Sequence, residues 1–252
     1  MHNRATRPRR RARLVSDRTL HLCAAFGLSP ALAVRAPRPN TRLARQLADS
    51  RAKLTLITGP SGAGKSLLID ALAREARRRG IRLVRVAAAP TLRRARAGPN
   101  VQTGTRTVVD RLGLPLGQAV RVLAWSGLAE ARLMARRVDR LSAGERARFE
   151  IARAWSVTLR TRAPGRGDPA SDACWVVADE FLALLDRPTA AACAAALSRS
   201  LRRNDLPARW FVATSHADLA RALRPDVIVR VREGGTRTLR ANIRSGGADD
   251  AS

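Results

Sequence analysis

The sequence predicts an α/β fold in which a mainly parallel sheet is flanked by helices and carries a helical insert subdomain. The first observation is a β-rich run at residues 53–58 (KLTLIT), followed by a glycine-rich turn and an amphipathic segment with helical spacing. The second is that short apolar runs recur downstream after segments of helical periodicity. Strands that alternate with helices form a parallel sheet, because each helix carries the chain back across it.

The composition is that of a packed protein with an excess of basic charge. The 252 residues are 45% apolar, which excludes a wholly disordered chain, and no uncharged apolar run is long enough to predict direct membrane insertion. Lys and Arg number 48 against 20 Asp and Glu, a net charge of +28. This surplus fits a nucleic-acid, anionic-membrane or acidic-protein partner, and equally a solvated basic surface.

The expected organisation is one domain between two tails. Residues 1–18 form a basic tail outside the fold, residues 19–244 form the domain with its helical insert at about 105–140, and residues 245–252 form a flexible tail. The three cysteines, Cys23, Cys174 and Cys193, lack metal-like spacing. A reduced, cytoplasmic location fits them best.

The first half of the domain is expected to run from strand to helix to strand and then into the insert. The strand at 53–58 leads into a helix at 65–79, which Gly80 ends. In order, the next elements are a strand at 81–88, a basic loop at 91–104, insert helices at 116–124 and 129–137, and a helix that starts at LSAGE, 141–145, and runs to about 159.

The second half returns to the sheet. An Arg-, Gly- and Pro-rich loop at 160–172 precedes an apolar strand at 174–178, which two acidic residues close. In order, the remaining elements are a helix at 189–203, a strand at 209–213 that ends in Thr214, Ser215 and His216, and last strands at 226–231 and 236–240.

The glycine-rich turn matches a phosphate-binding loop. GPSGAGKS at 59–66 has the form GxxxxGK[ST] between a strand and a helix, and chance would place its glycines and lysine about 0.01 times in such a chain. Glycines let backbone N–H groups point at phosphate oxygens, and the helix N-terminus adds partial positive charge. The predicted nucleotide-binding residues are Gly59, Pro60, Ser61, Gly62, Ala63, Gly64, Lys65, Ser66 and Leu67.

Within this loop, Lys65 and Ser66 have distinct expected roles. Lys65 supplies a compact charge for the β and γ phosphates of ATP, and Ser66 supplies a hydroxyl ligand for Mg²⁺. Only Lys53 and Lys65 are lysines in a chain that otherwise uses arginine. A lysine at this one crowded position agrees with a point-charge role that a planar guanidinium would not fit.

Two carboxylates follow the apolar strand at 174–178. Asp179 is expected to hold Mg²⁺, directly or through water, and Glu180 to orient or deprotonate the attacking water. Ligands gather at the carboxyl ends of strands in open α/β sheets. Taken alone, paired acids after a strand would equally be a helix cap or a solvated turn.

With these features in place, the sequence resembles the ATP-binding cassette (ABC) ATPases over about residues 53–230. LSAGE followed by RARFEIARAW, residues 141–155, has the form of their signature loop and helix. The glycine loop, helical insert, signature, acidic pair and His216 also arrive in the family's order. LSAGE alone would be an ordinary helix start, with Ser142 as the cap and Glu145 at the capping-box position.

The resemblance implies a P-loop ATPase that functions as a dimer. The signature loop of one cassette closes over the nucleotide of a second, so Ser142, Gly144 and Glu145 would face the γ phosphate held by a homodimer or heterodimer partner. Glu180 would activate water, His216 would sense the γ phosphate, and Lys65 would hold it. Asp186 would lie in the loop between subunits.

Several positions depart from the family pattern. Gln102 would be the glutamine that joins sheet and insert as a metal ligand, but its surroundings are atypical. No aromatic is in place to stack on adenine, and Phe26 is better explained as a core residue. Ala143 replaces a common glycine, and residues 19–52 lack the strand pattern of a transporter cassette's antiparallel subdomain.

The branch of the family is suggested by longer runs. VVADEFLALLDRPTA at 176–190 and ATSHADL at 213–219 look like soluble ABC ATPases associated with acetyltransferase-like domains. The expected function is therefore a dimeric ATPase that couples ATP turnover to conformational change in a protein or nucleic-acid partner, not in a transporter. The alternative is the nucleotide-binding subunit of an ABC transporter with separate membrane chains. A P-loop small-molecule kinase is less favoured, because LSAGE and the acidic pair argue against it.

Overall fold

The protein is described here by a computed structural model, which covers residues 16–27, 29, 40–86, 106–160, 174–203, 206, 208–232 and 237–241. The chain divides into two units, Met1–Arg38 and Pro39–Ser252. In the first unit, helix α1 (Asp17–Ala25) begins after Ser16, whose hydroxyl oxygen accepts a hydrogen bond from the backbone N–H of Thr19. The helix thus includes the last two residues, 17 and 18, of the segment expected to be a tail.

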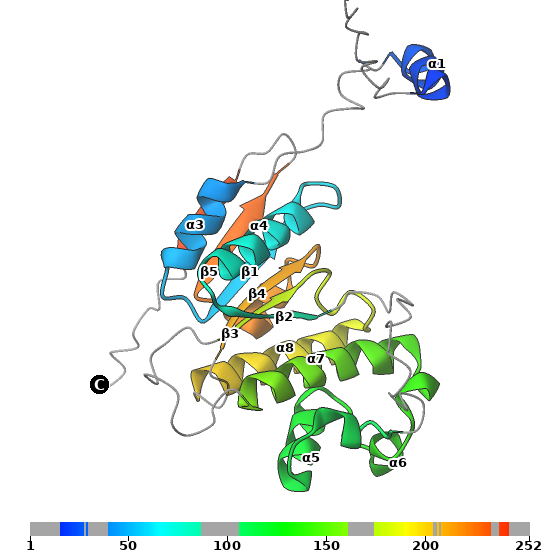
Figure 1. The fold of residues 1–252 in the computed structure, drawn as a ribbon, viewed down its shortest axis with the longest axis vertical. Coiled ribbons are helices and arrows are strands. Elements are labelled where there is room, and N and C mark those ends of the chain that lie inside the picture. Colours follow the sequence, from blue (N-terminus) through cyan, green and yellow to red (C-terminus); the bar gives the residue numbers. More distant parts are fainter. Residues whose placement is uncertain are drawn as a thin grey trace, which may run out of the picture. The chain divides into compact units, whose positions relative to one another are not determined.

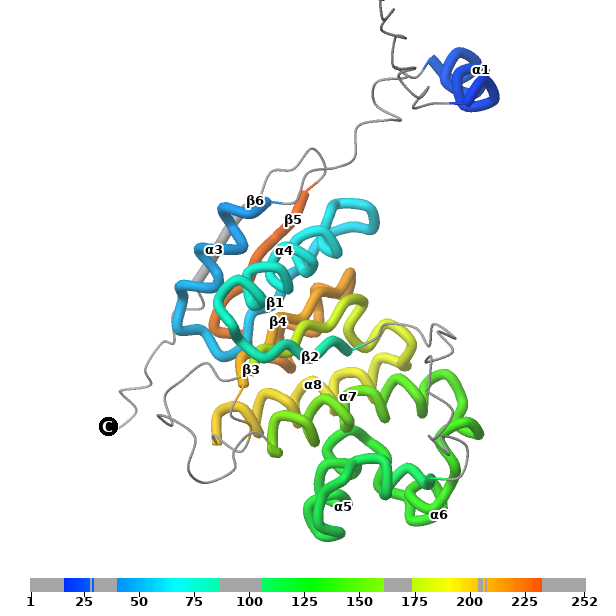
Figure 2. The backbone as a smooth tube through the Cα atoms, in the orientation of Figure 1, coloured from blue at the N-terminus to red at the C-terminus, as the bar shows by residue number. Residues whose placement is uncertain are grey.

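The second unit contains a six-stranded sheet, in which five strands are parallel and the sixth is antiparallel (Figures 1 and 2). The order is β2-β3-β4-β1-β5-β6, so β1 lies between β4 and β5. The prediction of a mainly parallel sheet is confirmed. The strands are β1 Leu54–Thr58, β2 Arg82–Val86, β3 Cys174–Ala178, β4 Arg209–Thr214, β5 Val227–Val231 and β6 Arg237–Ala241.

Helices cover both faces of the sheet (Figure 1). One layer holds α3 (Thr41–Asp49) and α4 (Lys65–Arg78), and the other holds α7 (Ala143–Arg160), α8 (Arg187–Arg202) and α9 (Leu219–Leu223). Because side chains alternate along a strand, Trp175 and Val177 of β3 pack toward α4, whereas Val176 packs toward the other layer. Strands covered on both faces are continuously apolar, as β3 is, and β4 is buried along its whole length with an apolar centre between Arg209 and Thr214.

Helix α3 was not expected from the sequence, and a buried arginine ties it to the sheet. Arg209 at the start of β4 is 4% exposed and donates hydrogen bonds to the carbonyl oxygens of Leu47 and Ala48. Its guanidinium also lies 5.1 Å from the ring centroid of Trp175. These contacts give the buried guanidinium hydrogen-bond acceptors and an aromatic ring to lie against, and they fix the C-terminal end of α3.

The insert between β2 and α7 is helical, as predicted, but one helix is much shorter than expected. It contains α5 (Leu116–Trp125) and α6 (Ala131–Met134), with short 3₁₀ turns at Asp110–Leu112 and Val138–Arg140. The predicted helix at 129–137 is wrong beyond Met134. The carbonyl oxygens of Met134 and Arg136 accept hydrogen bonds from Val109 and Val108, so they cannot continue the helix.

Candidate nucleotide-binding site

The loop between β1 and α4 depends on its glycines. A Cβ atom at Gly59 would lie 2.1 Å from the carbonyl oxygen of Val231, so only glycine fits there. Gly62 and Gly64 have left-handed φ values of 78° and 96°, and Gly64 is the residue that caps α4. The loop therefore has the backbone that its sequence predicts, and the N-terminus of a 14-residue helix follows it.

Lys65 closes the loop on itself. Its side chain is buried, and Nζ donates hydrogen bonds to the carbonyl oxygens of Gly59 at 2.9 Å and Pro60 at 2.8 Å. The ammonium therefore lies across the concave side of the loop, where a phosphate would sit. Ser66 is exposed in the first turn of α4, and Leu67 is half-buried beside it. The roles of the loop residues toward ATP stay predictions.

The predicted acidic pair and histidine lie at the same edge of the sheet as the loop. Thr58 at the end of β1 pairs with Thr214 at the end of β4, and Ala178 at the end of β3 pairs with Val212. All three strands are parallel, so Gly59, Asp179 and His216 follow their carboxyl ends. With neighbouring strands about 5 Å apart, β1 and β3 are separated by roughly 10 Å, a gap that a triphosphate and its metal can span.

The turn after β3 is held in an unusual backbone conformation. Glu180 has a φ of 47°, in the left-handed region, and its N–H donates to the Asp179 carboxylate at 3.0 Å. The N–H of Phe181 donates to the carbonyl oxygen of Ala213 in β4 at 2.7 Å. A left-handed non-glycine residue costs of order 1–3 kcal/mol, so the neighbours must hold it there. The result leaves the Glu180 side chain exposed at the edge.

His216 is positioned by a residue that the sequence analysis did not single out. The backbone N–H of His216 donates to the hydroxyl of buried Thr214 at 3.1 Å. The imidazole is half-buried. A hydroxyl two residues before the histidine, in the run TSH, is the signal that could have identified this contact.

The signature segment forms the capping box that its sequence allows. The Glu145 carboxylate accepts from the Ser142 N–H at 2.7 Å, and the Ser142 hydroxyl accepts from the Glu145 N–H at 3.2 Å. The hydrogen bond from the Ser142 backbone, with the nearby charge of Arg136, lowers the pKa of Glu145. The helix start is thus rigid, and the predicted role toward a phosphate remains compatible with it.

The signature also touches the turn that follows the acidic pair. A Cβ atom built on Gly144 would lie 3.5 Å from Leu185 Cδ2 and 3.8 Å from the carbonyl oxygen of Leu184. Asp186, which follows, caps α8 by accepting from the Thr189 N–H at 2.9 Å. Residues 180–186 therefore run from the acidic pair past the start of the signature helix to the start of α8.

The predicted ligands of Mg²⁺ have the chemistry that this ion requires. Ser66 offers a hydroxyl and Asp179 a carboxylate, both oxygen donors of the kind that Mg²⁺ prefers. Among the described residues, no cluster of three or more His, Cys, Asp or Glu residues forms a complete metal cage. Gln102, the third predicted ligand, lies outside the described residues.

Phe26 lies in the first unit, next to the end of α1. The residue is 72% exposed, so Phe26 is not buried within the first unit itself. In the described parts of residues 19–52 no strand is present, which agrees with the missing strand pattern. Over the described part of the chain, no helix combines the length and apolar character needed to cross a bilayer.

Comparisons with known proteins show similarity of sequence and of fold. Residues 46–160 match the family described as ABC transporter. The fold is similar to the dimeric structure of MJ0796, a bacterial ABC transporter cassette, with 17% identity over 75% of this chain and 85% of that one, and a TM-score of 0.51. No curated protein matches the sequence.

Two further structures give the same result. A post-hydrolysis dimer of MJ0796 bound to ADP and Pi has 18% identity over 75% of this chain and 85% of that one, with a TM-score of 0.50. An ATP-binding subunit of an ABC transporter has 16% identity, covers 76% of this chain and 80% of that one, and has a TM-score of 0.50. At such identities these structures establish the fold alone.

Proposed function

We propose that this chain, an ATPase of the ABC type with the α/β P-loop fold of that family, is the nucleotide-binding subunit of a transporter whose membrane-spanning domains are separate chains. ABC ATPases hydrolyse ATP to ADP and phosphate. The observation that carries the proposal is the gathering of the phosphate loop, Asp179 and Glu180 at one sheet edge. The cassettes it is similar to are described as parts of transporters.

Binding of ATP would use the loop first. The triphosphate takes the place of the Gly59 and Pro60 carbonyl oxygens as the partner of Lys65, while backbone N–H groups of the loop and the start of α4 face the phosphates. Ser66 and Asp179 would hold Mg²⁺, which neutralises charge between the β and γ phosphates when bound. The chain's own contribution is to position these groups.

Hydrolysis would need a general base and a group that contacts the γ phosphate, both at the same edge of the sheet. Glu180 orients a water molecule and accepts its proton, because the left-handed turn leaves this carboxylate exposed beyond β3. His216, held by Thr214, donates toward the γ phosphate. Both roles require groups that are already in place before ATP arrives.

Completion of the site would require a second copy or a related cassette. Ser142, Gly144 and Glu145 lie at the start of α7, where Gly144 is close to the Leu184–Leu185 turn. We assign them to the γ phosphate bound by the partner subunit. The family's dimers, such as that described for MJ0796, support this arrangement. We place the dimer at the cytoplasmic side of the membrane.

A second candidate is an ATPase that acts on a protein or nucleic acid and not on a transporter. The net charge of +28 favours it, because a polyanionic partner would be attracted over long distances. The resemblance to ABC ATPases associated with acetyltransferase-like domains also belongs to this candidate. None of the matches reported above names an acetyltransferase.

Membrane association separates the two candidates. In cells that make the protein naturally, a transporter subunit is expected to sediment with membranes and to be released by alkaline carbonate, which strips peripheral subunits. An ATPase of the second kind is expected in the supernatant, with ATP turnover that rises when nucleic acid is added. If the protein does not sediment with the membranes, the transporter proposal is contradicted.

A further inference from the structure

At the opposite edge of the sheet, we infer that a basic groove along α8 and α9 binds the phosphodiester backbone of duplex nucleic acid. A pocket of about 420 Å³ opens beside the starts of β1 and β5, and a second of about 360 Å³ adjoins it along α8 and α9. The two share Ser198, Arg202 and Arg224, so they form one continuous recess, the α8–α9 groove. Six cationic side chains line it: Arg51, Lys53, Arg199, Arg202, Arg221 and Arg224.

The charge of the groove rests on its five arginines. Within the described part of the chain, no carboxylate lies within ion-pair distance of any of its five arginines. Of the described residues that line the groove, Asp226 alone is acidic, and its carboxylate accepts hydrogen bonds from the backbone N–H groups of Lys53 at 2.8 Å and Leu54 at 2.9 Å. The groove therefore presents a strong net positive charge to a ligand.

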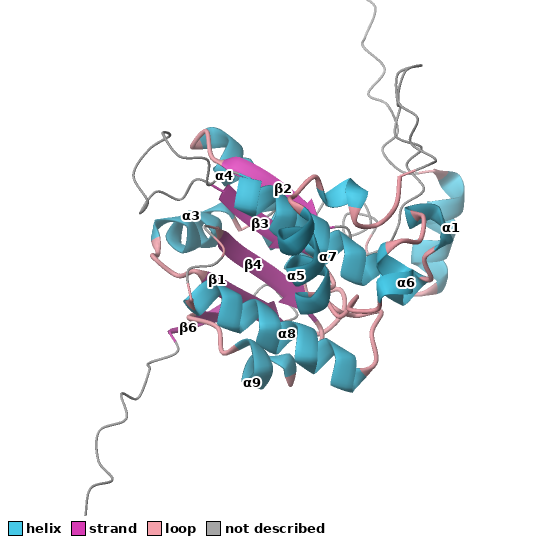
Figure 3. Cartoon of the chain, turned by 90° about the horizontal axis from the view of Figure 1, so that it is seen from below, coloured by secondary structure: helices cyan, strands magenta, loops and turns pink. Residues whose placement is uncertain are grey.

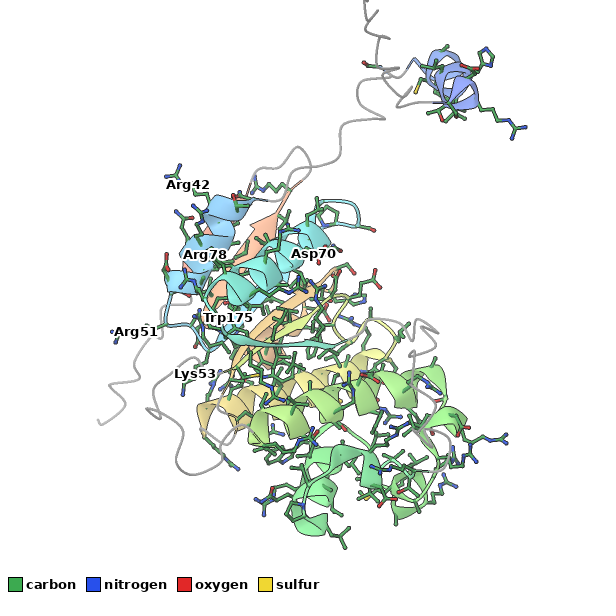
Figure 4. All side chains as sticks on the ribbon, viewed as in Figure 1. Arg42, Arg51, Lys53, Asp70, Arg78 and Trp175 are labelled. Atoms are coloured by element: carbon green, nitrogen blue, oxygen red, sulfur yellow. The ribbon has the colours of Figure 1, made fainter. Side chains whose placement is uncertain are left out.

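The groove is distinct from the nucleotide site. Lys53 precedes β1 and Asp226 precedes β5, whereas the phosphate loop follows β1. A five-residue strand separates the two edges by roughly 15 Å. Figure 3 shows α9 beside α8, away from the α4 layer, and Figure 4 shows Arg51 and Lys53 close together near the start of β1.

Local structure holds the arginines in place. Arg202 donates to the Arg224 carbonyl oxygen at 2.9 Å and to the Ser198 hydroxyl at 3.1 Å. Arg224 itself ends α9 with a left-handed φ of 44°, a position where glycine is the usual residue. An arginine there is strained, and what it adds over glycine is a guanidinium at the rim of the groove.

The chemistry of the lining selects the class of ligand. One guanidinium group can bind two oxygens of a phosphate at once, through two parallel N–H donors. None of the described residues that line the groove is aromatic, so it offers no surface for stacking exposed bases. Recognition would use the backbone of a duplex, independent of sequence. A recess suits a chain of phosphates better than the flat surface of a bilayer.

The test compares two triple variants of the full chain that lose the same charge. The groove variant is Arg199→Gln, Arg221→Gln and Arg224→Gly, and the matched control is Arg42→Gln, Arg45→Gln and Arg121→Gln, all exposed elsewhere. Figure 4 shows Arg42 at the other end of α3 from Arg51. The probe is a short fluorescently labelled DNA duplex, followed by anisotropy at several salt concentrations.

The groove variant is expected to bind the duplex about tenfold or more weakly and to lower the slope of log affinity against log salt by about 2 to 3, because each phosphate contact adds about 0.9. The control should change much less. Arg224→Gly alone should weaken binding while its melting temperature holds or rises, since glycine relieves the left-handed strain. That result excludes misfolding as the cause of lost binding.

Three outcomes would overturn the inference. The first is equal duplex affinity for the groove variant and the control variant. The second is no binding of the duplex by the wild-type chain at low salt. The third is that vesicles of anionic lipid or polyglutamate depend on the groove arginines and the duplex does not, which would assign the groove to a membrane surface or an acidic protein.

Discussion

The Nζ atom of Lys65 lies 2.9 Å from the carbonyl oxygen of Gly59 and donates a hydrogen bond to it. The buried ammonium thus has partners within its own loop, and the same backbone that bends around it is shaped to enclose a phosphate. ATP binding replaces weak neutral acceptors with strongly charged ones. This contact explains how the loop keeps a buried charge before nucleotide arrives.

Replacing Lys65 tests that relationship. Lys65→Met keeps an unbranched chain of similar length and removes the charge, so ATP affinity should fall by about tenfold or more, the effect of about 1.5–3 kcal/mol from a charged hydrogen bond. Titration with a fluorescent ATP analogue measures it. Arg42→Met removes the same positive charge from an exposed position of α3, so this variant should bind ATP as the wild type does. Equal affinities for the two variants would contradict the role of Lys65.

Alanine substitutions at Gly59 and Gly117 test whether the shape of the loop requires glycine at position 59. Gly59→Ala places a Cβ against the Val231 carbonyl oxygen, so the free energy of unfolding should fall by about 3 kcal/mol or more. Gly117→Ala lies in α5 with open space around it and should be neutral or stabilising by about 0.5–1 kcal/mol. Urea unfolding distinguishes them, and similar midpoints would show that the loop adapts.

The signature prediction can be tested without disturbing the helix start. Asp and Asn both cap helices as well as Ser does. Ser142→Asp would set a negative charge against the partner's γ phosphate and should abolish turnover, whereas Ser142→Asn should retain much of it. Mixing Ser142→Asp with Lys65→Met should restore turnover, because one hybrid site contains neither change. Absence of any recovery on mixing would count against sites shared between subunits.

Glu75 predicts a change of stability in acid. Hydrogen bonds from Arg78, supported by Arg79, lower its pKa from 4.5 to about 2. Its folded-state pKa is depressed, so its contribution is complete above pH 4.5 and is lost as the pH falls toward 2. Arg79 also forms an ion pair with Asp49 at the end of α3. Protonation of Glu75 should therefore weaken the contact between α3 and α4. At neutral pH the free energy of unfolding of Glu75→Gln should be lower than that of the wild type, and the two values should converge near pH 2. A difference that does not change with pH would contradict this.

Sequence periodicity and motif spacing were enough to predict most of the sheet. The observed strands β1 (Leu54–Thr58) and β3 (Cys174–Ala178) are buried along their whole length, and β-favouring or apolar residues dominate both runs. The acidic pair and His216 could be placed at one edge because parallel strands end together. The capping box of Ser142 and Glu145 depends only on residues three apart.

Long-range contacts account for what sequence reasoning missed. Helix α3 has polar and apolar residues at helical spacing, but its place depends on Arg209, more than 150 residues away in the chain. The early end of α6 is set by Val108 and Val109, which take its carbonyl oxygens. The left-handed turn at Glu180 depends on Ala213 in the neighbouring strand. Local pattern carries no signal of these long-range contacts.

The measurement that tests the account most directly is ATP turnover by wild type and Glu180→Gln, with mass followed by light scattering with and without ATP and Mg²⁺. We expect the wild type to turn over ATP and the variant to lose turnover, keep ATP binding and accumulate as an ATP-bound dimer. Turnover by the variant at the wild-type rate, or a monomer under every condition, would contradict the assignment of Glu180 and of a site completed by a second cassette.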